Sequence, residues 1–301
     1  MRRRESGIAA LTAILIVAVA ASAAAMMLSQ QSAMLDQTML VASRAQAEQY
    51  AHAGLDWARG VLAQDARASA IDTLKEGWAQ PIVGLPVERA VVAGAIADEQ
   101  GKLNLNNLAR GAARSEPDVR AFRSLLSSLD LSPELAEPVV EWMLVNGSDA
   151  HYLSLPRPYR SHHGPLAQVD ELYRVRGFDM RTIERLRPFV TALPGDRTPV
   201  NANTATERVL AAVLGAPAEK VAELVAARGK KPFETVDAFN DAARGLGLTP
   251  PSGTFDVKSA WFSVLVRVQQ DDVLLGAEAL VRREDAAKGG LATVAWKRPR
   301  Y

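Results

Sequence analysis

The chain has 301 residues, of which 48% are hydrophobic and 23% are charged, an ordinary composition for a globular protein of one to three domains. Its formal net charge of +1 excludes a strong bulk attraction for nucleic acid. The sequence contains no cysteine, which excludes disulfides, a lipid-modified cysteine, zinc–thiolate sites and thiol catalysis.

Residues 1–28 join a short cationic segment, MRRRESG, to a long apolar run. In residues 8–28 the only polar side chains are those of Thr12 and Ser22. At about 1.5 Å per residue this run forms a helix of about 31 Å, which matches the hydrocarbon core of a bilayer. The arginines on one flank predict that the N-terminus lies in the cytoplasm. We therefore expect a single-pass transmembrane helix over 8–28.

Three interpretations of this N-terminus compete. Ala23-Ala24-Ala25 satisfies the small-residue rule of a cleaved secretory signal, although the apolar run is longer than usual for one. A plain signal anchor is the second interpretation. The third rests on the abrupt start of the apolar run after Gly7, which resembles a type IV prepilin leader. That resemblance implies that prepilin peptidase cleaves between Gly7 and Ile8, that Ile8 is N-methylated, and that the helix stays on the protein.

Thr12 would be the fifth residue of the mature chain after such a cleavage. Most pilins carry glutamate there, and an isolated carboxylate in lipid is costly unless it is paired. In pilus assemblies the partner is thought to be the N-terminal ammonium of a neighbouring subunit. A tip subunit has no such neighbour above it. The threonine therefore suits either a tip subunit or a membrane anchor that never needed the charge.

Residues 29–68 contain no proline, and apolar side chains recur close to the 3.6-residue period, as at Leu35, Met39 and Leu62. This pattern predicts that the helix leaves the bilayer and continues as an amphipathic helix with one buried face. Tyr50 and Trp57 are expected in the core or in an interface, because aromatic side chains bury large areas.

Residues 87–96 are rich in small and β-branched side chains and precede the turn signal DEQG at 98–101. They predict a strand, a tight turn, and then a second short strand or loop. In the segment that follows, leucines alternate with Asn104, Asn106 and Asn107. We expect these asparagines to cap local backbone groups.

Residues 110–253 change to a helical pattern with short loops. Ser132 and Thr204 are the predicted N-caps of two of the helices. The expected helices cover 117–128, 132–145, 167–176, 180–190, 204–213, 217–228 and 235–243.

Two stretches of this block, 165–195 and 199–239, resemble helix-hairpin-helix units. In DNA-binding versions of that unit the hairpin offers backbone N–H groups to phosphates. Here Pro217 has no N–H to donate, and Asp179 would repel a phosphate. We therefore expect no nucleic acid as a partner, and a membrane-anchored helix-hairpin-helix DNA-binding protein is kept as an alternative.

Three strands are expected near the C-terminal end. Val264, Val266 and Val268 alternate within 255–269. Residues 273–283 follow a turn at 270–272, and residues 291–297 follow a glycine turn at 288–290. Such short connections predict antiparallel pairing.

Five segments carry the longest similarity to a known family, and they occur in that family's order: SRAQAEQYAHAGLDWARGVLAQD, DEQGKLNLNNL, EWMLVNGSDAHYL, PYRSHHGPLAQVDELYRVRGF and LRPFVTALPGDRTPVNANTA. They resemble the minor pseudopilin K family of type II secretion systems. The resemblance implies an α+β, pilin-like fold, with a long N-terminal transmembrane and amphipathic helix on a small antiparallel sheet. It also implies a large inserted all-helical domain containing helix-hairpin-helix or SAM-like units.

The implied domain organisation has five parts. These are a prepilin leader at 1–7, the transmembrane half of the pilin helix at 8–28, the pilin spine and first strands at 29–109, the inserted helical domain at 110–253, and the C-terminal strands of the pilin sheet at 254–301.

The resemblance implies a non-catalytic minor pseudopilin at the tip of the type II secretion pseudopilus. Its role would be pseudopilus assembly or length control, and export of folded periplasmic proteins across the outer membrane. Implied partners are the other minor pseudopilins, the major pseudopilin, prepilin peptidase, membrane lipid, secreted cargo and the outer-membrane channel. The chain would lie in the bacterial inner membrane with its C-terminal domain in the periplasm. A minor pilin of a type IV pilus is the main alternative.

No G-x-S-x-G, H-E-x-x-H or P-loop motif occurs in the sequence, so no catalytic residue is predicted. The family's loop that corresponds to 141–152 is usually acidic and is associated with calcium. Here it offers Glu141, Asn146, Ser148 and Asp149, fewer carboxylates than calcium prefers. Asp149 is the candidate calcium ligand, and no cofactor is expected to be required.

Overall fold

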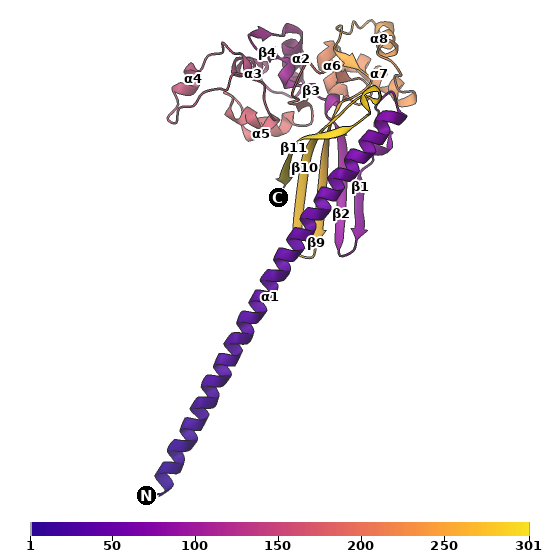
Figure 1. Ribbon diagram of the computed structural model, residues 1–301. Helices are drawn as coiled ribbons and strands as arrows, with labels where there is room; N and C mark the ends of the chain where they lie inside the picture. Colours follow the sequence, from indigo (N-terminus) through magenta and orange to yellow (C-terminus); the bar gives the residue numbers. More distant parts are fainter. Residues whose placement is uncertain (1, 301) are drawn as a thin grey trace.

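The computed structural model describes residues 2–300, and the side chains of residues 9–300. Its longest element is helix α1 (Arg2–Ala68), which projects far from the rest of the protein (Figure 1). At about 1.5 Å per residue its 67 residues reach about 100 Å. Every residue from Ala9 to Ala42 is exposed, so this half of α1 has no packing partner within the chain.

The second half of α1 packs against a five-stranded antiparallel sheet. The strand order is β1 (Ile82–Val87), β2 (Ala90–Asp98), β9 (Trp261–Gln270), β10 (Val273–Arg283) and β11 (Ala292–Arg300). The buried side chains of α1 recur at helical spacing at 47, 51, 55, 58 and 62, and they share one hydrophobic core with the inward-facing valines of β9.

The turn between β9 and β10 marks where this head begins along α1. The Ser43 hydroxyl donates a hydrogen bond to Oδ2 of Asp271 in that turn, at 2.8 Å. Arg89, in the turn between β1 and β2, forms an ion pair with the same carboxylate at 2.8 Å. Residues 9–42 therefore extend past the sheet on the side of the N-terminus, free to enter a bilayer.

Residues 99–260 leave the sheet after β2 and return at β9. They form a helical insertion beyond the end of the sheet that is farther from the N-terminus (Figure 1). Its helices are α2 (Glu116–Ser128), α3 (Ala136–Met143), α4 (Ala150–Leu153), α5 (Met180–Leu186), α6 (Glu207–Leu214), α7 (Ala218–Lys230) and α8 (Val236–Gly245). Its short strand pairs are β3 (Leu103–Asn104) with β6 (Val190–Thr191), β4 (Ala109–Arg110) with β5 (Ala113–Arg114), and β7 (Val200–Asn201) with β8 (Phe255–Asp256).

Two hydrophobic cores hold the insertion together. The first surrounds Phe122 and Trp142 and joins α2, α3 and α5. The second surrounds Phe239 and joins α6, α7 and α8 to Phe255, which precedes the return to the sheet. The helical block is thus held by its own cores, as expected for an inserted unit.

The architecture confirms the expected α+β, pilin-like fold, and several local predictions were wrong. Strand β1 was missed because Gly84 and Pro86 interrupt its pattern; Gly84 adopts φ +68° where the register with β2 shifts, and Pro86 suits an edge strand. The predicted helix 167–176 is a 3-10 helix at Val169–Arg174. The segment 132–145 splits into a 3-10 turn at Pro133–Leu135 and α3, although Ser132 caps the turn as predicted.

Thr204 is not the N-cap of α6. That role belongs to Thr206, whose side chain accepts from the N–H of Val209. The Thr204 hydroxyl instead donates to Oδ2 of Asp98 at 2.6 Å. A buried carboxylate thus engages a side chain that the local pattern assigned to a helix end.

The predicted domain boundaries at 110 and 253 stay predictions. Leu103, Leu105 and Leu108, which precede the first boundary, pack in the first core of the insertion. Phe255 and Val257, which follow the second, pack in its second core. By packing alone, the insertion therefore begins and ends a few residues outside the predicted block.

Candidate functional site

The exposed half of α1 is the first functional feature. Among the described residues one helix, Ala9–Ala68, is long and apolar enough to cross a membrane, with a mean hydropathy of 2.4 in a stretch that is not buried. The hydroxyls of Thr12 and Ser22 donate to the backbone carbonyls of Ala9 and Ala18 at 2.9 and 2.8 Å. Both polar groups are satisfied inside the helix, which lipid requires.

The predicted cleavage site lies at the start of this helix. Gly7 and Ile8 fall within the bounds of α1, and their side chains lie outside the described part of the chain. Cleavage between them and N-methylation of Ile8 stay predictions.

An apolar groove lies between α1 and the β1–β2 hairpin. It encloses about 290 Å³ and is lined by Gly54, Trp57, Leu85 and other small or apolar side chains of these elements. Gly54 allows the close approach of helix and sheet, because a Cβ there would lie 2.9 Å from Cγ1 of Val266. Trp57 is 55% exposed at the groove, so it does not lie in the core, and the interface position that was the other expectation stays a prediction.

A polar junction joins the sheet to the insertion, and we define it by Asp72, Asp98, Asn201, Ser259 and Arg283, all buried. Nδ2 of Asn201 lies 3.0 Å from Oδ2 of Asp98 and 2.9 Å from the Ser259 hydroxyl oxygen. It also lies 3.2 Å from the backbone oxygen of Asp72. One amide thus links three segments that are far apart in the chain.

Arg283, at the end of β10, is the cation of the polar junction. Its side chain is 1% exposed, and it contacts Oδ2 of Asp72 at 2.5 Å and Oδ2 of Asp65 at 2.6 Å. It also donates to the backbone oxygen of Ser259 at 2.7 Å. Its guanidinium lies over the ring of Phe262, 4.6 Å from the centroid. The junction therefore fixes the end of α1, the sheet and the insertion to one another.

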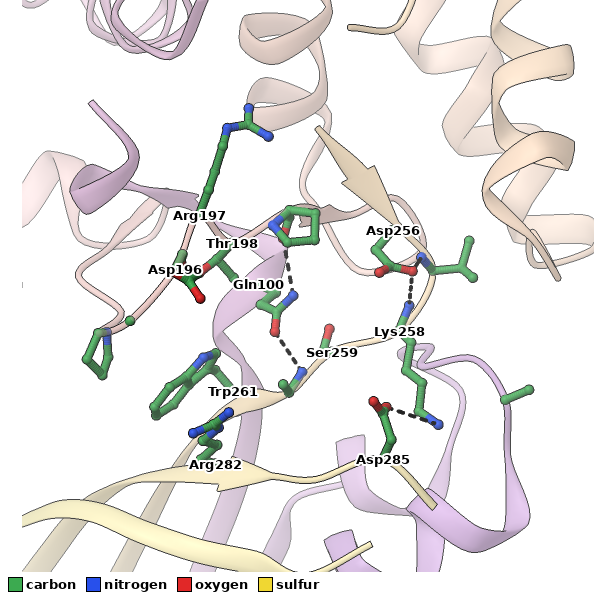
Figure 2. A pocket seen from close by; sticks show the side chains of 16 residues that line it. Gln100, Asp196, Arg197, Thr198, Asp256, Lys258, Ser259, Trp261, Arg282 and Asp285 are labelled. Carbon is green, nitrogen blue, oxygen red and sulfur yellow. Dashed lines mark hydrogen bonds and ion pairs between the residues drawn. The ribbon is translucent and has the colours of Figure 1, made fainter. Parts of the chain in front are cut away.

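Beside this junction a polar cleft of about 660 Å³ opens between the sheet and the insertion (Figure 2). The side chain of Gln100 crosses it, accepting from the N–H of Ala260 at 2.6 Å and donating to the oxygen of Pro199 at 3.2 Å. Lys258 and Asp285 also line the cleft, with Nζ of the lysine 4.0 Å from Oδ1 of the aspartate (Figure 2). These bonds tie the 194–199 loop to the start of β9 and make the cleft part of the domain junction.

Burial raises the pKa of Asp98 to about 6. Since the folded chain then holds a proton that the unfolded chain has released, we expect its contribution to stability to decline as pH rises from about 4 through 6, by about 3 kcal/mol in total. Urea unfolding across this range, compared between the wild type and Asp98→Asn, measures the difference. Parallel profiles for the two proteins would contradict this prediction.

Asp149, the predicted calcium ligand, lies among donors. Its Oδ1 accepts from the N–H of Ser161 at 3.0 Å, and its Oδ2 lies 3.4 Å from Arg160 and 3.3 Å from Nε2 of His163. The hydrogen bond from Ser161 is the main cause that lowers the pKa of this carboxyl. Glu141, which was expected nearby, pairs with Arg176 at 3.9 Å. Among the described residues, Asp149 and Glu141 do not fall in a group of three side chains that could hold a metal ion, and protein cations face both acids. Calcium at Asp149 stays a prediction.

No local sequence pattern predicted the polar junction, although two of its residues lie in segments with a recognisable pattern. Asn201 lies in the segment VNANTA, and Asp98 begins the turn signal DEQG. The asparagines of the following segment do more than cap local groups: Asn106 bonds to Leu166 and Leu193, far along the chain. Spacing along the sequence carries no signal for such contacts.

Comparisons with known proteins agree with this architecture. Two models of one family, described as Type II secretion system (T2SS), protein K, match residues 101–195 and 200–258. A protein named Type II secretion system protein K from Pseudomonas aeruginosa is 30% identical over 90% of this chain and 87% of its own length. Its namesake from Klebsiella pneumoniae is 31% identical over 79% of this chain and 80% of its own length.

One solved structure is similar over most of the fold. It is described as the crystal structure of the GspK-GspI-GspJ complex from the enterotoxigenic Escherichia coli type 2 secretion system. The matching chain aligns with a TM-score of 0.74 at 23% identity, covering 88% of this chain and 99% of that one. The match therefore supports the long helix, the sheet and the helical insertion as one shared fold.

Proposed function

The chain belongs to the type II secretion system protein K family, and from this membership we propose that it is the minor pseudopilin that caps the tip of a type II secretion pseudopilus. The relatives favour this role over a minor pilin of a type IV pilus or a helix-hairpin-helix DNA-binding protein. The proposed role is non-catalytic: assembly or length control of the pseudopilus, and with it export of folded proteins.

The position of the insertion is the observation that carries the tip placement. It lies beyond the end of the sheet that is farther from the N-terminus (Figure 1). In a filament of parallel pilin helices, the next subunit would be added on that side. A folded block of residues 99–260 there obstructs the addition, so the subunit ends the filament.

Thr12 supports the same placement. Its hydroxyl is satisfied by Ala9 within α1, so it needs no charged partner from a neighbouring subunit. A subunit above would offer an N-terminal ammonium without a carboxylate to receive it, and an unpaired charge in lipid is costly. The tip is the one position where no such ammonium arrives.

Partners follow from the surfaces that the fold leaves open. The matching solved chain was crystallised in a complex with GspI and GspJ, and we propose that this chain likewise meets two other minor pseudopilins. The exposed half of α1 would contact lipid and the helices of sister subunits, including the major pseudopilin. The insertion, which projects from the tip, would face secreted cargo and the outer-membrane channel.

The anchor implies an inner-membrane location with the N-terminus in the cytoplasm and the head in the periplasm. Prepilin peptidase would act on the chain before assembly, between Gly7 and Ile8. We expect that chain recovered from membranes begins at N-methylated Ile8, and that Gly7→Leu keeps Met1 and fails to enter the pseudopilus. Intact mass of the purified protein measures both.

Ser6→Ala is the matched control, because it alters the leader without altering the cleaved bond, and it should be processed normally. A wild-type chain that keeps Met1 would indicate a plain anchor, and one that begins at Met26 would indicate a cleaved secretory signal. Labelling of assembled pseudopili tests the tip placement separately: signal spread along the filament length would refute it.

A further inference from the structure

Three carboxylates meet where α1 ends and the chain turns back toward the sheet. One oxygen each of Asp65, Asp72 and Glu76 lies within 4.8 Å of the other two. Asp65 is in the last turn of α1, and the other two follow in the connecting segment. Across the part of the chain that the structure describes, this is where three side chains able to hold a metal ion come together.

An unsatisfied oxygen within this cluster points to a ligand. Asp72 has no exposed surface, and its Oδ1 meets no donor among the described residues. Its other oxygen accepts from the N–H of Ser259 at 2.7 Å and from Arg283 at 2.5 Å. Buried carboxylate oxygens are normally satisfied by a donor, a water or a cation.

The charge of the cluster points the same way. Arg283 contacts Asp65 and Asp72, so one positive charge faces three negative ones and two negative charges remain. Glu76 uses Oε2 to accept from the N–H groups of Thr73 and the Trp78 indole, at 2.7 and 2.9 Å. Burial, with the charges of Glu76 and Asp72, raises the pKa of Asp65 to about 6. The cluster of Asp65, Asp72 and Glu76 therefore keeps an excess of negative charge even with Arg283 beside it.

We propose that Asp65, Asp72 and Glu76 bind a divalent cation, with calcium as the ion that the all-oxygen ligand set favours. Calcium–oxygen distances of about 2.3–2.6 Å put opposite ligands about 5 Å apart, so oxygens within 4.8 Å of one another can surround one ion. Asp65 and Glu76 are half-buried, so an ion could reach these two carboxylates from solvent. The bound ion would tie the end of α1 to the head, at a place separate from Asp149.

Terbium luminescence tests this site in the detergent-solubilised full chain. Because the Trp78 indole donates to Glu76, terbium bound there lies beside a tryptophan and should emit when tryptophan is excited. We expect saturable emission that calcium displaces. Glu76→Gln keeps an oxygen that can accept from Thr73 and Trp78 but loses the charge, and it should weaken calcium binding at least tenfold.

Two further variants separate this site from others. Asp149→Asn should leave terbium and calcium binding unchanged, and Trp78→Phe should abolish the emission while calcium still raises the melting temperature. If Glu76→Gln fails to fold, judged by near-UV circular dichroism, Asp65→Asn takes its place. Calcium binding that survives both Glu76→Gln and Asp65→Asn, or that disappears in Asp149→Asn, overturns the proposal.

Discussion

Replacing Arg283 by methionine should lower the free energy of unfolding by about 3–5 kcal/mol, because it leaves a buried carboxylate without its cation. Asp72 has no exposed surface, and Arg283 is its charged partner at 2.5 Å. Methionine fills much of the same volume, so the effect reports charge and hydrogen bonding more than lost packing. Urea unfolding of the detergent-solubilised chain at neutral pH measures it.

Arg282→Met is the matched control for Arg283→Met. Arg282 is the preceding residue on β10, is exposed, and lies over the ring of Trp261 at 5.8 Å in the polar cleft (Figure 2). Its replacement should change the stability by less than about 1 kcal/mol, the range of exposed cation–π contacts. Equal losses in the two variants would show that the polar junction does not depend on the buried guanidinium.

Replacing Asn106 by alanine should destabilise the insertion by about 3 kcal/mol. Its amide donates to the carbonyls of Leu166 and Leu193 at 2.9 and 3.0 Å, and its oxygen accepts from the N–H of Leu166 at 2.8 Å. All three bonds are buried, and each contributes about 1 kcal/mol, with a larger penalty where a buried partner is left unsatisfied. Near-UV circular dichroism during urea unfolding follows the loss, since Trp142 lies in the affected core.

Asn146→Ala serves as the control for Asn106→Ala. Asn146 is exposed in the same insertion, and its replacement should change stability by no more than about 0.5 kcal/mol. If Asn106→Ala were as mild as this control, the buried asparagine would not be a structural link between residue 166 and residue 193.

Several parts of the structure could be predicted from the sequence, because the patterns that indicate them extend over only a few neighbouring residues. The apolar run after Gly7 and the amphipathic pattern through Leu62 predict one continuous helix, and α1 is that helix. The hairpin of β9 and β10 follows from alternating valines and a short turn. The prepilin resemblance also drew attention to Thr12, whose hydroxyl the structure shows to be satisfied within the helix.

The roles of other side chains depend on contacts with residues elsewhere in the chain, and no local sequence pattern predicts such contacts. Asp149 looked like a metal ligand by its place in a loop, yet its partners come from Arg160, Ser161 and His163 beyond the next helix. Thr204 fits a helix start and instead serves a carboxylate that lies more than a hundred residues earlier. Helix caps and metal ligands use the same oxygen-bearing side chains, so their roles depend on which groups the fold brings near.

By itself, the sequence determined the long apolar N-terminal helix, the secondary structure of most of the chain and its order, because hydrophobic periodicity acts over a few residues. Only the tertiary structure decided how the parts are joined. Asp72, Asn201 and Arg283 meet through the return of the chain to the sheet after the insertion. Their hydrogen bonds and the ion pair between Asp72 and Arg283 are stronger there than in water, because the surrounding fold excludes solvent. Burial is a property of the assembled fold, and it turns these ordinary polar residues into a junction and a candidate cation site.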